Sequence, residues 1–129
     1  MLLRCGHVYV YDCLWIKPPH PKIAVCFCPE RNWFFWFNSE ARFHGHGQLA
    51  VGEAEFPPVL TKDCYLDLSQ VCAGSPQELA TASDRGLLPA PLLSKVVRAL
   101  GSPIFTLPDI NRKLALANLS ALARPPSNS

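Results

Sequence analysis

The sequence has little of what marks membrane-spanning or exported proteins. None of its apolar runs approaches the roughly 18 residues that a membrane-spanning helix needs. Near the N-terminus, Arg4 and His7 interrupt the apolar residues before they reach the length of a signal-peptide core. The net charge of +2 is too small to indicate nucleic-acid binding by itself. We therefore expect a cytoplasmic protein that does not insert into a membrane.

The chain also lacks the cysteine spacing typical of zinc and redox sites. No two of its six cysteines stand in a C-x-x-C arrangement. Without an export signal, disulfides are not expected, and free cysteine is among the most often buried residue types. We expect six reduced thiols that serve as small core residues: Cys5, Cys13, Cys26, Cys28, Cys64 and Cys72.

Two adjacent apolar runs are the most prominent feature of the sequence. Residues 21–28 are rich in apolar residues, and residues 33–37 are five aromatic residues in succession. Each run is too short for a typical helix, and the polar break at 29–32 separates them, which predicts two buried strands joined by a short turn. Because a large aromatic side chain buries roughly 150–250 Å², this hairpin should form the centre of the core. A length of 129 residues, 49% of them apolar, suits one domain.

Further short strands are predicted around the hairpin. Residues 6–12 contain many strand-forming side chains, residues 49–51 form a short apolar run, and residues 64–69 alternate as a last strand should. The three prolines in residues 17–21 predict a stiff surface loop before the hairpin, and residues 53–58 predict another loop.

Helical patterns replace the strand patterns after Val71. Ser75, Pro76 and Glu78 form a helix start with a capping box, and this helix should run to about Ser83 and stop at Gly86. Residues 90–100 predict a second helix ended by Gly101. A third helix should open at residues 107–109 and place four apolar residues on one face: Ile110, Leu114, Ala117 and Ala121.

This layout predicts a mainly β protein with appended helices, of the α+β class. Short strands without crossover helices favour a small antiparallel barrel over residues 1–72. Residues 73–123 should form a helical extension packed on the barrel, and residues 124–129 a disordered tail.

Three segments carry a resemblance to a known family. Residues 6–10 (GHVYV), 20–25 (HPKIAV) and 60–71 (LTKDCYLDLSQV) resemble the first, second and closing strands of the PemK/MazF toxin family. The resemblance covers about residues 6–72. The chain carries His20 where the family usually has arginine before the proline, and Cys64 where the closing strand commonly has serine. It also has a helical extension that the family lacks.

The resemblance implies an SH3-like barrel and a toxin-type endoribonuclease of a toxin–antitoxin system. Members of this family typically cleave single-stranded RNA without a metal or other cofactor, usually form homodimers, and are neutralised by an antitoxin protein. For this chain it therefore implies single-stranded RNA as substrate, an antitoxin as partner, and a homodimer.

The candidate catalytic residues follow from the chemistry of such cleavage. The 2′-hydroxyl of the RNA attacks the phosphate, so the site needs a base, an acid and a cation. Histidine can act as base and acid near neutral pH, which makes His20, His44 and His46 the catalytic candidates. Lys22 and Arg42 are the candidate substrate-binding cations. Residues 18–22 enter the central hairpin and residues 42–47 leave it, so we expect the two segments to converge.

Other interpretations of the same residues stay open. The histidines also fit exposed loops, and Thr61 and Asp63 fit a turn cap better than a site. Four paired ligands could bind zinc: Cys26, Cys28, His44 and His46. The aromatic run fits a buried core, but an exposed Trp33 or Trp36 could stack on bases or fill a dimer interface. The alternative function is a non-catalytic SH3-like module that binds a protein.

Overall fold

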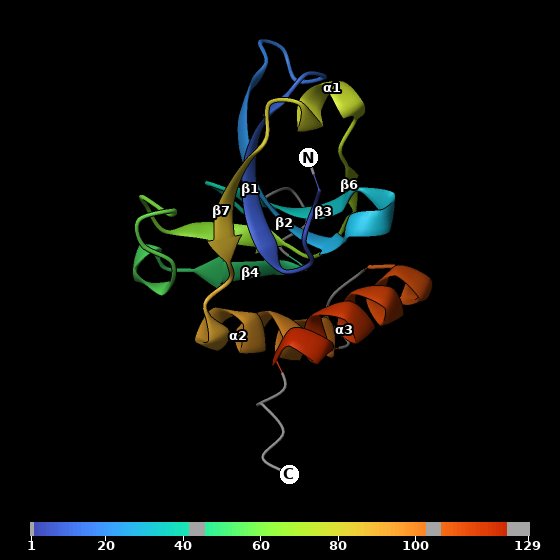
Figure 1. The fold of residues 1–129 in the computed structure, drawn as a ribbon. Helices are drawn as coiled ribbons and strands as arrows, with labels where there is room; N and C mark the ends of the chain where they lie inside the picture. Colours follow the sequence, from blue (N-terminus) through green and yellow to red (C-terminus); the bar gives the residue numbers. More distant parts are fainter. Residues whose placement is uncertain (1, 42–45, 103–106, 124–129) are drawn as a thin grey trace.

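The structure is a computed structural model and describes residues 2–41, 46–102 and 107–123. A strongly twisted antiparallel sheet occupies most of the molecule, and two helices lie side by side against one side of it (Figure 1). Within the described ranges, no helix has the length and apolar character that crossing a bilayer would take.

The central hairpin forms as predicted. Strands β2 (His20–Cys28) and β3 (Trp33–Asn38) pair antiparallel, with Val25 opposite Phe35. A 3₁₀ turn, η1 (Pro29–Arg31), joins them, and Asn32 closes it with φ of 57°. β2 begins at His20, one residue before the predicted run of residues 21–28. His20 and Pro21 pair with the end of β1 (His7–Cys13), so they belong to the strand and not to the predicted loop.

The remaining strands extend the sheet on both sides of the hairpin. The order is β4-β5-β3-β2-β1-β7, with β6 paired to β3, and every described pairing is antiparallel. The additional strands are β4 (Gln48–Val51), β5 (Cys64–Asp67), β6 (Cys72–Ala73) and β7 (Ser83–Leu87). The predicted β-rich α+β class is therefore correct. β4 and β7 remain the outer strands, so the described part of the sheet is not closed into a barrel.

The helix predicted from residue 75 to about 83 is wrong beyond its first turn. α1 (Pro76–Leu79) has the predicted capping box between Ser75 and Glu78, but it stops after four residues. The Thr81 hydroxyl donates to the Glu78 carbonyl at 2.7 Å and accepts the Asp12 N–H at 2.9 Å. This ties the chain to β1, and the following residues pair with β1 as β7, so Cys64–Asp67 is not the last strand.

The two long helices agree with the sequence pattern in extent. α2 (Ala90–Leu100) has the predicted bounds, and α3 spans Asp109–Ala123. The predicted apolar face of α3 is wrong, because Ala115 and Leu119 are buried while Ile110 is 77% exposed. The Asn118 amide donates to the Phe27 carbonyl at 2.8 Å, which fixes the rotation of α3 against β2.

The sheet has two differently covered faces. We call the first the helix-covered face: Val8, Val25, Phe27, Phe35 and Phe37 pack there with α2 and α3. We call the second the loop-covered face: Tyr9, Tyr11, Ala24, Cys26, Phe34 and Trp36 pack there with Leu3, Ile16, Leu79 and Ala82. The covering residues of the second face come from the N-terminal segment, the β1–β2 loop (residues 14–19) and the α1 region. Each face therefore has its own apolar cluster.

Candidate functional site

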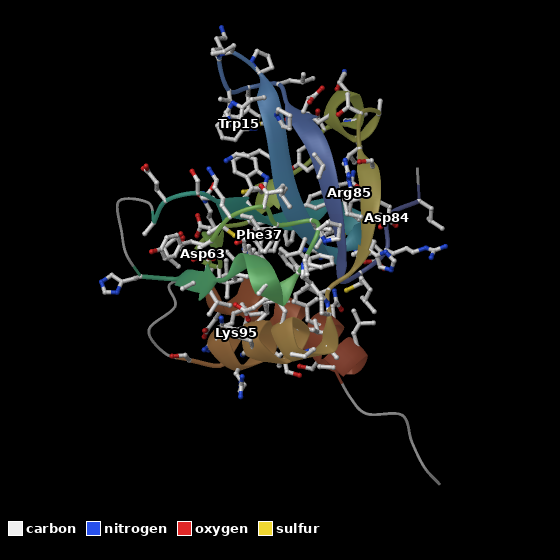
Figure 2. The ribbon with its side chains drawn as sticks, turned by 90° about the vertical axis from the view of Figure 1, so that its left-hand side faces the viewer. Trp15, Phe37, Asp63, Asp84, Arg85 and Lys95 are labelled. Carbon is white, nitrogen blue, oxygen red and sulfur yellow. The ribbon has the colours of Figure 1, made fainter. Side chains whose placement is uncertain are left out.

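A pocket of about 580 Å³ opens where β2 begins and β3 ends. The register explains its position: Ile23 lies opposite Phe37, and Asn38 lies opposite Tyr65 of β5. The segment leading into β5 therefore runs alongside the β2–β3 pair, on the side of the molecule seen in Figure 2. The lining comprises residues 20–23, 37–41, 60–62 and 64.

Lys22 is a buried, hydrogen-bonded cation in the lining of the pocket. Its side chain is 7% exposed, and its Nζ donates to Asn38 Oδ1 at 2.9 Å. The same nitrogen lies 4.8 Å from the centre of the Trp36 ring, within cation–π range. Burying a cation is costly unless it is hydrogen-bonded or otherwise compensated, and these two contacts meet that need. Lys22 therefore presents a fixed positive charge at the pocket wall.

Exposed polar side chains line the same pocket as Lys22. His20 is exposed at the first position of β2, and its Nδ1 lies 3.4 Å from the Pro18 carbonyl oxygen. Thr61 and Lys62 face the same pocket from the segment before β5. Glu40 is the one acidic residue of the lining, so lysine charges outnumber carboxylate charges there. This small excess of positive charge suits an anionic ligand.

The thiol in the pocket wall is not an activated nucleophile. Cys64 is 7% exposed. Burial raises the pKa of its thiol, the neighbouring Asp63 and Glu55 raise it further, and Lys62 offsets only part of this. Since the thiolate is the reactive form of cysteine, Cys64 acts here as an apolar wall of the pocket.

Two of the five site residues predicted from the sequence lie together in the pocket. His20 and Lys22 both line it. Arg42 and His44 lie outside the described residues, and exposed His46 is not among the lining residues. Ala41, which precedes the predicted exit segment 42–47, shares the pocket with His20. The predicted convergence of that segment with residues 18–22 remains a prediction, because residues 42–45 lie outside the described residues.

Two lining residues were missed by the sequence reasoning. Asn38 ends the aromatic run and Lys62 stands in a polar loop, so neither had a local signal of function. Only the β3–β5 pairing brings them together. Asp63 does not line the pocket, and its Oδ1 accepts the Glu53 N–H at 3.0 Å, in keeping with a turn cap.

The cysteines behave as core residues, as predicted. All six are free and five are buried. Burial raises the pKa of Cys26 to about 12 and that of Cys72 to about 12, so both thiols are protonated near neutral pH. Residues i and i+2 of a regular strand share a face, but a bulge between Cys26 and Cys28 sends their side chains into different apolar clusters.

This arrangement disfavours joint zinc binding by Cys26 and Cys28. Both are buried in separate clusters, and His46 is exposed. In the part of the chain that the structure describes, no three cysteine, histidine or acidic side chains gather in a way that could hold a metal ion. His44, the fourth proposed ligand, lies outside that part.

The aromatic run is mostly buried, and the exposed tryptophan is a different one. Trp36 is 6% exposed, while Trp33 is half-buried with the Arg31 guanidinium 5.0 Å from its ring centre. Trp15, in the β1–β2 loop, is 67% exposed and stacks on Trp36.

Comparison of the chain with protein-family models, with curated proteins and with solved structures gives no significant match.

Proposed function

We propose that the protein binds and cleaves single-stranded RNA in the pocket at the start of β2, as a PemK/MazF-like endoribonuclease with an SH3-like strand arrangement. The observation that carries this proposal is the gathering of His20, Lys22 and Lys62 around one pocket of about 580 Å³. A phosphodiester needs positive charge, and a ribose hydroxyl needs a proton acceptor nearby. The pocket offers both kinds of group.

The proposed reaction needs no cofactor. The 2′-oxygen of the RNA forms a bond to phosphorus, and the bond between phosphorus and the 5′-oxygen breaks. One proton leaves the 2′-hydroxyl and one is added to the departing 5′-oxygen, which yields a cyclic phosphate and a 5′-hydroxyl. His20 serves as one proton carrier, and Lys22 and Lys62 hold the phosphate. His44 or His46 is the proposed second proton carrier, with Arg42 as a further cation.

Expression in cells and a cleavage assay test the proposal together. Wild-type protein should arrest growth and degrade RNA, and the purified protein should cut a single-stranded RNA in the presence of a chelator. His20→Ala should lower the cleavage rate at least about 100-fold, the lower end of the contribution of general acid–base catalysis. His7→Ala is the matched control, because His7 contacts Asp84 of β7 and does not line the pocket.

Two outcomes would contradict the proposal at different levels. If wild-type protein neither arrests growth nor cuts RNA, the nuclease is wrong. If His20→Ala cuts as fast as His7→Ala, the reaction stands but the assignment of His20 is wrong.

The homodimer and the antitoxin partner are separate proposals. Light scattering of the purified protein tests the first, and rescue of growth by a co-expressed neighbouring open reading frame tests the second.

A non-catalytic protein-binding module is the second candidate. The observation that favours it is the apolar part of the pocket, where Pro21, Ile23, Phe37 and Leu60 line one cavity. SH3 domains dock proline-rich peptides in aromatic-lined grooves, and Phe37 gives this cavity an aromatic wall. NMR titration of the isotope-labelled protein with a proline-rich peptide tests this function. Binding should change the chemical shifts of these four residues. Absence of shifts at peptide concentrations up to the millimolar range would reject it.

A further inference from the structure

Trp15 is an exposed aromatic residue held in a fixed orientation. It is 67% exposed, yet its ring stacks on Trp36 with centroids 5.4 Å apart and an angle of 23° between the planes. Figure 2 shows Trp15 near the far end of the β1–β2 hairpin, at the opposite end of the molecule from Lys95 of α2. One face of the ring is occupied by Trp36, and the exposure of the residue leaves the other available.

The ring beneath Trp15 is itself locked. Trp36 is 6% exposed, and its Nε1 donates to the hydroxyl of buried Tyr11 at 2.8 Å. Lys22 Nζ lies 4.8 Å from the centre of the same ring. A ring that is already immobilised loses little conformational entropy when a ligand stacks on it. Trp15 is therefore a preorganised aromatic surface.

The backbone that carries Trp15 is also anchored. The Leu14 N–H donates to Glu78 Oε2 at 3.0 Å, and the neighbouring Ile16 packs on the loop-covered face. Glu78 is 3% exposed and is held by the capping box of α1. The loop thus has a defined conformation around the tryptophan.

Lys22 links this aromatic surface to the pocket. Lys22 lines the pocket and also contacts Trp36, on which Trp15 stacks. The Trp15 ring centre therefore lies no more than about 10 Å from Lys22 Nζ. A stacked strand rises about 3.4 Å per nucleotide, so a few nucleotides connect the two features. Lys17, exposed two residues after Trp15, adds positive charge to the same loop.

We propose that Trp15 forms a nucleobase-stacking subsite for the single-stranded RNA whose phosphate backbone the pocket binds. This inference rests on the proposed function and adds a residue outside the three segments that carry the resemblance, residues 6–10, 20–25 and 60–71. Single-strand binding surfaces combine basic side chains along the backbone with aromatic rings on which bases stack. Lys17 in the same loop and Lys22 within about 10 Å supply positive charge for the phosphates that flank a stacked base, which favours a nucleotide over an apolar protein side chain.

A binding experiment with a non-cleavable strand tests the subsite. The probe is a fluorescently labelled 2′-O-methyl oligonucleotide of mixed sequence, about ten nucleotides long and so within known site sizes. A second probe has the same backbone but carries abasic units. Trp15→Ala should weaken binding of the first probe about 5- to 100-fold, as removal of one stacking aromatic does. It should leave the affinity for the abasic probe unchanged.

Three variants separate stacking from other causes. Trp15→Phe keeps an aromatic face and should restore most of the affinity, whereas Trp15→Leu is apolar without one and should not. Leu14→Ala, in the same loop and 44% exposed, is the matched control and should bind like the wild type. Circular dichroism of each variant shows whether the fold is intact, and the Phe and Leu pair tests the proposal even if the alanine variant unfolds.

The outcomes distinguish this inference from the function on which it rests. If wild-type protein binds neither probe, the proposed RNA-binding function fails and the subsite fails with it. If wild-type protein binds the first probe and Trp15→Ala binds it equally well, the subsite is overturned and the function stands. Equal weakening with both probes, or full restoration by Trp15→Leu, also overturns the stacking role.

Discussion

The two faces of the sheet differ in chemistry as well as in what covers them. On the helix-covered face, the buried side chains are almost all hydrocarbon, and long helices exclude water from them. On the loop-covered face, tyrosine hydroxyls, a tryptophan N–H and three buried thiols are interspersed with the apolar groups. Short irregular segments cover that side. The polar contacts of Lys22 and Glu78 also lie at its margin.

This difference indicates that the two faces contribute differently to the structure. Hydrocarbon burial is non-directional and scales with area, so the helix-covered face should supply most of the stability. Hydrogen bonds have preferred geometry, so the loop-covered face should hold particular groups in particular places. The held groups include Trp36, Lys22 and the loop that carries Trp15.

The largest expected effect is on the helix-covered face. Phe35 is fully buried there and stacks on Phe27, with centroids 4.2 Å apart. Phe35→Ala should lower the free energy of unfolding by about 3–5 kcal/mol, since a large cavity replaces the ring. Urea unfolding followed by circular dichroism measures this. Ile110→Ala, which truncates a side chain 77% exposed on α3, is the control and should change stability by less than about 0.5 kcal/mol.

An intermediate effect is expected at the margin of the loop-covered face. Glu78 accepts hydrogen bonds from the backbone of Ser75 and Leu14 at 3.0 Å each. Glu78→Ala should cost about 2–3 kcal/mol, because two donors lose a charged acceptor. Hydrogen exchange should also accelerate at the Leu14 amide. Glu78→Gln keeps a neutral acceptor, so it should lower the free energy of unfolding by less than Glu78→Ala. Equal losses of stability in the two variants would contradict a role for the negative charge of the carboxylate.

The smallest effect is expected at the exposed edge strand β7. Partial burial raises the pKa of Asp84, but hydrogen bonds from the Gly86 N–H and His7 outweigh it, so the pKa falls below its ordinary 3.8. The resulting stability is present above about pH 3.8 and is lost as the pH falls through the lower folded value. Asp84→Asn should therefore cost at most about 1 kcal/mol near neutral pH, because the pair is exposed and screened.

Titration of stability with acid checks the sign of this prediction. The free energy of unfolding of the wild type should fall more steeply below about pH 3.8 than that of Asp84→Asn. Parallel curves would show that the His7–Asp84 contact makes no measurable contribution. Raising the salt concentration should reduce the difference in the free energy of unfolding between the wild type and Asp84→Asn at neutral pH.

The elements predicted correctly are those whose signals are local. The hairpin of β2 and β3 follows from two apolar runs and a polar break, and α2 follows from an apolar stripe that ends at Gly101. The strand β7 has the sequence SDRGL, which has no apolar alternation, and it exists because β1 offers an unpaired edge. Local propensity gives way there to a tertiary contact.

The residues of the candidate site likewise fall into those that local sequence signals predict and those that they do not. His20 and Lys22 were predictable because they are titratable residues in a proline-bounded segment. Asn38 and Lys62 were not, because only the β3–β5 register joins their segments. Trp15 was not singled out as an exposed aromatic, because the loop that presents it is fixed by Glu78, 64 residues away from Leu14 in sequence.

The contact between α3 and β2 has a consequence for how the protein is made. Asn118 bonds to the Phe27 carbonyl across 91 residues of sequence, and β1 pairs with β7 across a similar span. Contacts so distant in sequence slow folding, because a long loop must close before they form. During synthesis, the aromatic hairpin leaves the ribosome well before the segments that cover it. The nascent chain therefore passes through an interval in which its most apolar stretch is open to chaperones and to other nascent chains.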